Sequence, residues 1–101
     1  MIKDDFIARL GGDEFIIITH RKDKSLVEFL EHIENYVIGQ YHIEGIIVHI
    51  ELSIGVSRYP QDTISESNMS RYADKAMYIA KKSPNKHYVF YKDIGYDTLS
   101  E

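Results

Sequence analysis

Residues 9–15 read RLGGDEF and lie between two apolar runs, FIA at 6–8 and FIII at 15–18. Two short apolar runs joined by a Gly-Gly pair predict a β-hairpin, because the favoured two-residue turn needs a positive φ at both central positions and glycine adopts it without a steric clash. Asp13 and Glu14 follow the glycines directly. Since neighbouring residues of a strand point to opposite faces, only one of these two carboxylates can aim fully at any one site.

An ordinary surface turn would contain the same residue types, and its two acids would then simply be solvated. The whole seven-residue string is a more specific signal than the Gly-Gly turn alone. Three stretches of the chain, in order and at family-like spacing, match one protein family. They are RLGGDEF at 9–15, SIGV at 53–56 with Tyr59-Pro60, and ADKAMYIAKK at 73–82. On these residues the chain resembles the GGDEF domain, the diguanylate cyclase family.

The resemblance also implies a part of the domain that these residues do not contain. Before the hairpin, a family member has a strand with a metal-binding Asp, two helices, and the Asn and Asp that recognise guanine. This chain starts at Met1, just ahead of the hairpin, and we expect it to cover somewhat more than half of the domain. The family's inhibitory product site uses an Arg-x-x-Asp pair, of which Asp5 is present but Ile2 replaces the Arg. We therefore expect no product site, and Asp5 to be an ordinary residue at a strand entrance.

Length and composition predict one small soluble domain. A chain of 101 residues allows a modest core. Its net charge of −4 comes from interspersed acids and bases, without a basic stripe that would suggest a nucleic-acid partner. The absence of cysteine excludes disulfides and thiolate metal sites. Since no apolar run approaches membrane-spanning length, we expect a cytoplasmic chain with no membrane partner, any membrane tether or upstream sensor domain lying outside these residues.

Hydrophobic periodicity predicts a helix, a strand and a second helix after the hairpin. Ser25 and Glu28 form a capping-box pattern at the start of the first helix, and Gly39 follows its end. Residues 46–57 alternate strictly, so we expect one apolar core face and one mostly polar face that includes Gly55. The predicted elements are a hairpin at 5–19, a helix at 25–38, a strand at 46–57, a helix at 66–82, a strand at 87–91 and a loose tail at 92–101.

This order predicts a partial GGDEF domain over residues 1–101, with an α+β fold and a mostly antiparallel sheet. It resembles the latter part of the palm-like, or ferredoxin-like, sandwich of nucleotidyl cyclases. The resemblance implies that the absent first strand lies between the hairpin and the strand at 46–57. We therefore expect two apolar strand edges that either close on each other or pair with a second copy. Since residues 16–18 are all isoleucine, we also expect the hairpin to be covered on both sides.

The family's reaction explains the residue types of its motifs. Each subunit of a homodimer holds one GTP, and the 3′-hydroxyl of each attacks the α-phosphate of the other, so that pyrophosphate leaves and cyclic di-GMP forms. In-line phosphoryl transfer needs divalent cations, and Mg²⁺ prefers carboxylate ligands. The resemblance therefore implies Mg²⁺, or Mn²⁺ in its place, as the cofactor, GTP as the substrate and a second GGDEF copy as the partner.

The residue roles come from the same resemblance. It implies Asp13 as a metal ligand and candidate general base, and Glu14 as a supporting acid of the metal site. Gly11 and Gly12 would form the turn against the nucleotide, where the lack of a side chain allows close backbone approach. Lys81 aligns with a family lysine that contacts the triphosphate.

Other polar residues have two interpretations. The family continues after the second helix with Gly-Arg-Asn, where this chain has PNK at 84–86, so a second phosphate contact is lost unless Lys86 substitutes for it. Arg9 suits an ion pair with one of the hairpin acids as well as a phosphate contact. His49 and Glu51 are either catalytic neighbours or, as we prefer, paired surface residues on a strand.

Two functional hypotheses follow. In the first, the chain is the C-terminal part of a diguanylate cyclase domain, and by itself it does not turn over GTP. In the second, it belongs to a degenerate domain that acts as a non-catalytic regulatory or dimerisation module. The intact string at 11–15 favours the first, because a purely structural turn does not need both acids.

Overall fold

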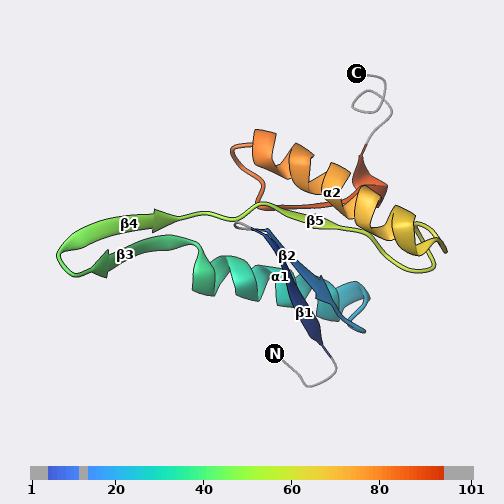
Figure 1. The fold of residues 1–101 in the computed structure, drawn as a ribbon, viewed down its shortest axis with the longest axis horizontal. Coiled ribbons are helices and arrows are strands. Elements are labelled where there is room, and N and C mark those ends of the chain that lie inside the picture. The colour runs from blue at the N-terminus through green and yellow to red at the C-terminus, as the bar shows by residue number, and fades with distance from the viewer. Residues whose placement is uncertain (1–4, 12–13, 95–101) are drawn as a thin grey trace. The chain divides into compact units, whose positions relative to one another are not determined.

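The structure, a computed structural model, describes residues 5–11 and 14–94 and has a mixed α/β fold (Figure 1). Its elements are β1 (Phe6–Gly11), β2 (Glu14–Ile18), α1 (Asp23–Val37), β3 (Gly39–Ile43), β4 (Ile46–Ile50), β5 (Ile54–Val56), α2 (Glu66–Lys82), β6 (Tyr88–Phe90) and a short 3-10 helix, η1 (Tyr91–Asp93). The described strands form three two-stranded sheets, of which β1–β2 and β3–β4 are antiparallel and β5–β6 is parallel. The expected mixed fold with mostly antiparallel pairing is therefore confirmed. The chain divides into two compact units, residues 1–31 and 32–101.

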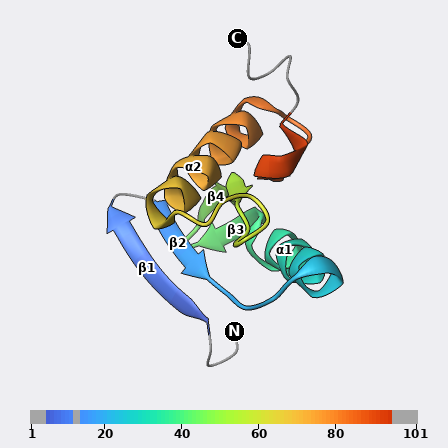
Figure 2. The same ribbon diagram turned by 90° about the vertical axis from the view of Figure 1, so that its right-hand side faces the viewer.

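In the first unit, β1 and β2 run side by side as an antiparallel ribbon (Figure 1 and Figure 2). Phe6 pairs with Ile18 on one face, and Ile7 pairs with Ile17 on the other. All four of these apolar side chains are at least 40% exposed. The expectation that both sides of the hairpin are covered is therefore not met within the described residues.

Helix α1 begins two residues earlier than the capping-box pattern predicts. The Ser25 hydroxyl accepts a hydrogen bond from the Lys22 backbone N–H (3.2 Å) and donates one to the Lys22 carbonyl (2.8 Å). Ser25 thus lies inside the first turn and stabilises it from there, instead of preceding the helix as its cap. Leu26 and Leu30, one turn apart, are the buried residues of this helix.

In the second unit, the predicted strand at 46–57 is two strands. β4 pairs antiparallel with β3, whereas β5 pairs parallel with β6, and residues 51–53 between them are not in a strand. The prediction of one continuous strand from this alternation was therefore wrong. Strand pairing depends on partners that lie elsewhere in the chain. The sequence analysis also missed β3. Its signal is the Glu44-Gly45 turn, whose two residues both have positive φ (49° and 80°), as a two-residue hairpin turn requires.

Helix α2 covers residues 66–82, the predicted range, and its ends are capped by side chains. The Ser65 hydroxyl accepts from the Asn68 N–H (3.4 Å), and the Ser83 hydroxyl donates to the Ile79 carbonyl (2.9 Å). The helix runs along β5 (Figure 1), and Ala76, Ala80 and Val89 form the buried cluster of this unit. Tyr91 packs against this cluster, and burial, followed by the adjacent Tyr72, raises the pKa of its phenol above the ordinary value.

The face of β5 that contacts α2 is the one that the sequence predicts to be polar. A Cβ added to Gly55 would lie 1.8 Å from the Ala73 carbonyl oxygen and 2.3 Å from the Met77 backbone nitrogen. The Ser57 hydroxyl, two residues on, donates to the Met69 carbonyl (2.8 Å). This correction has a steric reason, because the helix approaches most closely where the strand has no large side chain.

Candidate functional site

The hairpin positions two of the predicted site residues opposite each other. Gly11 and Glu14 form the last pair before the turn, and the register shifts between Arg9 and Gly11. Gly12 and Asp13, which were predicted to form the turn and to bind metal, lie outside the described residues. The described part of the motif is therefore the two strand ends on either side of residues 12 and 13.

Gly11 has a backbone conformation that glycine favours. Its φ is +144°, and apart from its chain neighbours no heavy atom of the described residues lies within 4 Å of the position that a Cβ would occupy. Among the described residues, the glycine is thus required by the backbone and not by crowding.

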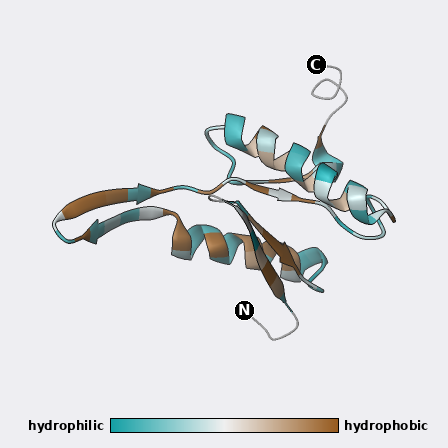
Figure 3. Ribbon diagram, viewed as in Figure 1, coloured by the Kyte–Doolittle hydropathy of each residue, from teal (hydrophilic) through white to brown (hydrophobic). Residues whose placement is uncertain are grey.

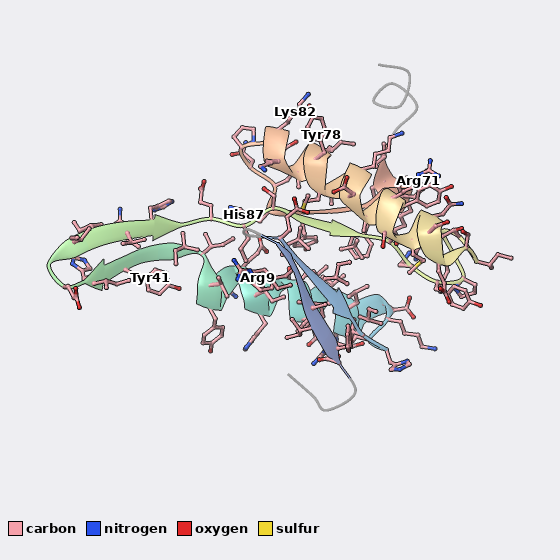
Figure 4. The ribbon with its side chains drawn as sticks, viewed as in Figure 1. Arg9, Tyr41, Arg71, Tyr78, Lys82 and His87 are labelled. Carbon is pink, nitrogen blue, oxygen red and sulfur yellow. The ribbon has the colours of Figure 1, made fainter. Side chains whose placement is uncertain are left out.

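Glu14 is exposed at the start of β2. The register places Arg9, which is labelled in Figure 4, opposite Phe15 and not opposite Glu14. Of the two residues that the sequence analysis predicts to bind metal, Glu14 is thus the one that the structure describes, and it is exposed.

The donor chemistry fits a magnesium ligand, although not a complete site. A carboxylate is a hard oxygen donor of the kind that Mg²⁺ prefers. Over residues 5–11 and 14–94, however, no group of three or more His, Cys, Asp or Glu side chains is arranged to hold a metal ion. Among the described residues, Glu14 is therefore a suitable donor but does not form a metal site with other side chains.

The predicted triphosphate contact belongs to the second unit. Lys81 is exposed in the last turn of α2, and Lys86 is exposed in the connection to β6. Lys81 thus has the accessibility that a phosphate contact requires.

Asp5 has a structural role that the sequence analysis did not predict. Its carboxylate is fully buried and lies 2.6 Å from Nη1 of Arg21, whose side chain is 18% exposed. The same guanidinium donates to the Thr19 hydroxyl (3.1 Å) and lies 4.0 Å from the centre of the Phe29 ring. Asp5 is therefore part of an ion pair inside the first unit, and not simply a strand-entrance residue.

Two of the five histidines lie close to glutamate side chains. His49 and Glu51 form an exposed pair at 3.5 Å, in agreement with the preferred surface interpretation. His87, which the sequence analysis did not single out, lies 2.9 Å from the Glu34 carboxylate and is partly buried (Figure 4). Its carbonyl also accepts from the Ile54 N–H (2.8 Å), so His87 joins the β5–β6 sheet to the end of α1. No signal in the sequence marks this pair, because its members are 53 residues apart.

Within the described part of the chain, no helix is long and apolar enough to cross a membrane.

Comparisons with known proteins agree on one family. The family model described as "Diguanylate cyclase, GGDEF domain" matches residues 1–87. The bifunctional diguanylate cyclase/cyclic di-GMP phosphodiesterase MucR of Pseudomonas aeruginosa is 35% identical over 89 residues, which are 87% of this chain and 13% of MucR. Diguanylate cyclase DgcP of Escherichia coli is 30% identical over 84 residues, 81% of this chain and 25% of DgcP. Diguanylate cyclase TpbB of Pseudomonas aeruginosa is 32% identical over 84 residues, 79% of this chain and 19% of TpbB. The chain thus spans a quarter or less of the length of these relatives.

Proposed function

The chain belongs to the GGDEF domain family of diguanylate cyclases, and on that premise we propose that it is the C-terminal part of a diguanylate cyclase domain in cyclic di-GMP signalling. The observation that carries the proposal is the hairpin, which pairs Gly11, in a backbone conformation that glycine favours, with an exposed Glu14. In the proposed reaction, two GTP molecules on two copies of the domain condense to cyclic di-GMP and pyrophosphate. A sensor domain of the same protein would regulate the reaction.

The proposed roles follow the motif residue by residue. Asp13 and Glu14 would hold Mg²⁺ or Mn²⁺, which when bound neutralises phosphate charge and favours ionisation of the attacking hydroxyl. Asp13 would also accept the proton of that hydroxyl. Gly11 and Gly12 would let the nucleotide approach the backbone, and the Lys81 ammonium would contact the triphosphate as a point charge.

The chain by itself is proposed to be inactive, because its hairpin supplies only two carboxylates and no base-recognition residues. Incubation of residues 1–101 with GTP and Mg²⁺, followed by mass spectrometry for cyclic di-GMP, should detect no product. Detection of cyclic di-GMP would refute inactivity while leaving the family chemistry intact.

The activity of the protein that contains this segment tests the catalytic role of Asp13. We expect Asp13→Ala to lower the rate of cyclic di-GMP formation by at least about 100-fold, because a ligand of the catalytic metal is lost. Glu28→Ala, which removes an exposed acid of α1, is the matched control and should retain the parental rate. A parent protein that binds no GTP and forms no product, with or without Asp13, would instead support the regulatory or dimerisation module.

A further inference from the structure

Positive charge is concentrated in one segment of this acidic chain. Residues 71–92 hold six of the 12 Lys and Arg residues but only one of the 16 Asp and Glu residues, which gives this segment a net charge of +5 and the remainder −9. The acids and bases that the sequence analysis describes as interspersed are therefore separated over residues 71–92, where cations dominate.

Helix α2 arranges part of this charge in a line. Arg71, Lys75, Tyr78 and Lys82 follow one another at spacings of four, three and four residues, so they share one side of the helix. We call these four residues the α2 stripe. It lies opposite the buried Ala76 and Ala80, and Figure 4 shows three of its members on the side of α2 that is turned away from β5.

The stripe has a surface that fits protein contacts. Tyr78 is 56% exposed, and Nζ of Lys82 lies 4.4 Å from the centre of its ring. Arg71, Lys75 and Tyr78 also line an open hollow of about 400 Å³ on this helix, together with Tyr72 and Asp74. None of the ion pairs formed between described residues uses the stripe cations. Exposed Tyr and Arg are the residue types that most often dominate the energy of protein interfaces.

We propose that the α2 stripe is a docking surface for an acidic helix of a partner protein. The regular spacing of the stripe matches carboxylates on one face of a second helix, which are separated by the same intervals. An extended polyanion such as nucleic acid fits less well. It would extend beyond the stripe, which is only about 16 Å long, so that part of its charge would have no partner there. Asp74, which also lines the hollow, repels a densely charged polyanion.

This docking surface does not depend on the proposed enzymatic function. The proposed function assigns none of its four residues to nucleotide or metal binding, and Lys81 lies about a quarter turn away from the stripe on the helix. If the cyclase proposal failed, the docking proposal would still stand. If the docking proposal failed, the cyclase proposal would still stand.

A labelled peptide tests the proposal on the full chain. The probe is a helical peptide with glutamates at positions i, i+4, i+7 and i+11, and its binding is followed by fluorescence anisotropy at low and high salt. Arg71→Glu/Lys75→Glu should weaken binding by about tenfold or more, because two attractive contacts become repulsive. The matched control Lys22→Glu/Lys24→Glu makes the same change in net charge at exposed positions of the first unit, and it should bind within about twofold of the parent chain.

Further comparisons separate this docking surface from non-specific attraction. Arg71→Gln/Lys75→Gln removes the charges without reversing them and should give a smaller loss, with circular dichroism verifying that each variant is folded. The proposal would be overturned if Arg71→Glu/Lys75→Glu and Lys22→Glu/Lys24→Glu weakened peptide binding equally. It would also be overturned if a scrambled peptide, with its glutamates distributed around the helix, bound as tightly as the probe. Tighter binding of a single-stranded oligonucleotide of equal charge would assign the stripe to nucleic acid instead. Self-association lost only in the Arg71 and Lys75 variants would assign it to a second copy.

Discussion

Gly55 in β5 lies so close to α2 that there is no room for a side chain at this position. The Cβ of any other residue would overlap the backbone of α2 at Ala73 and Met77, with separations of 1.8 to 2.9 Å. Backbone atoms inside a helix cannot move aside as a flexible side-chain tip can. The packing of α2 on β5 therefore depends on the absence of one methyl group.

Replacing Gly55 by alanine is expected to destabilise the chain. We expect Gly55→Ala to lower the free energy of unfolding by about 2 kcal/mol or more, because β5 and α2 must separate to admit the methyl group. Urea denaturation followed by circular dichroism measures the loss. Ser53→Ala, a change of similar size just before β5, should alter stability by less than about 0.5 kcal/mol, and an equal loss in both variants would contradict the steric account.

The ion pair between Asp5 and Arg21 gives a second prediction at this scale. Arg21→Met keeps an extended side chain but leaves the buried Asp5 carboxylate without its guanidinium partner, at an expected cost of about 3 kcal/mol. The double variant Asp5→Leu/Arg21→Met should recover part of that loss, because no charge is then left buried. Lys22→Met is the control at an exposed neighbouring position. Denaturation curves in which the single and double variants lose the same stability would show that the pair is not coupled.

At the scale of elements, the β3–β4 hairpin depends on its turn and on its attachment to α1. Glu44 takes a positive φ of 49°, which is unfavourable for a residue with a Cβ. The hydroxyl of Tyr41 in β3 donates to the carbonyls of Val37 (2.7 Å) and Tyr36 (3.1 Å), so it satisfies acceptors at the end of the helix (Figure 4). The helix end and the hairpin thus stabilise each other.

A better turn residue should therefore stabilise the chain. Asparagine adopts the left-handed conformation more readily than glutamate, and Asn-Gly is a preferred two-residue hairpin turn. Glu44→Asn is expected to raise the free energy of unfolding by about 0.5 kcal/mol. Glu51→Asn removes an exposed acid outside the turn and should not raise the free energy of unfolding. A neutral or destabilising Glu44→Asn would argue against this turn conformation.

At the scale of the whole molecule, the described residues bury few apolar side chains. Five hydrophobic residues are buried: Leu26, Leu30, Ala76, Ala80 and Val89. Large apolar side chains remain exposed on the strands of both hairpins, where the ribbon is coloured as hydrophobic in Figure 3. Two-stranded ribbons with exposed apolar faces are marginally stable and prone to pair with other chains.

We therefore expect the chain to self-associate as its concentration rises. Sedimentation velocity should show an average mass that increases above the 11.8 kDa of one chain. Ile7→Thr/Ile17→Thr makes one face of the β1–β2 ribbon more polar while keeping β-branched side chains, and it should weaken association. Tyr59→Thr/Ile64→Thr changes two exposed residues of a loop and serves as the control. A single species of 11.8 kDa at every concentration would contradict the expectation.

The sequence by itself determined the features that depend on residues close together in the chain. The range of α2 follows from its apolar period and from the proline of the PNK sequence just after its end. The pairing of β1 with β2 follows from two apolar runs around a glycine turn, and family membership follows from the same motif. In each case the decisive interactions lie within a few residues of one another.

Only the tertiary structure decided which distant segments meet. It divided residues 46–57 between two partners, turned the face with Gly55 toward α2, and joined Asp5 to Arg21 and His87 to Glu34. Alternation along a strand shows that two faces differ, but it does not show which face a helix will approach. That choice depends on the steric fit between segments far apart in the sequence, and local periodicity contains no information about such a fit.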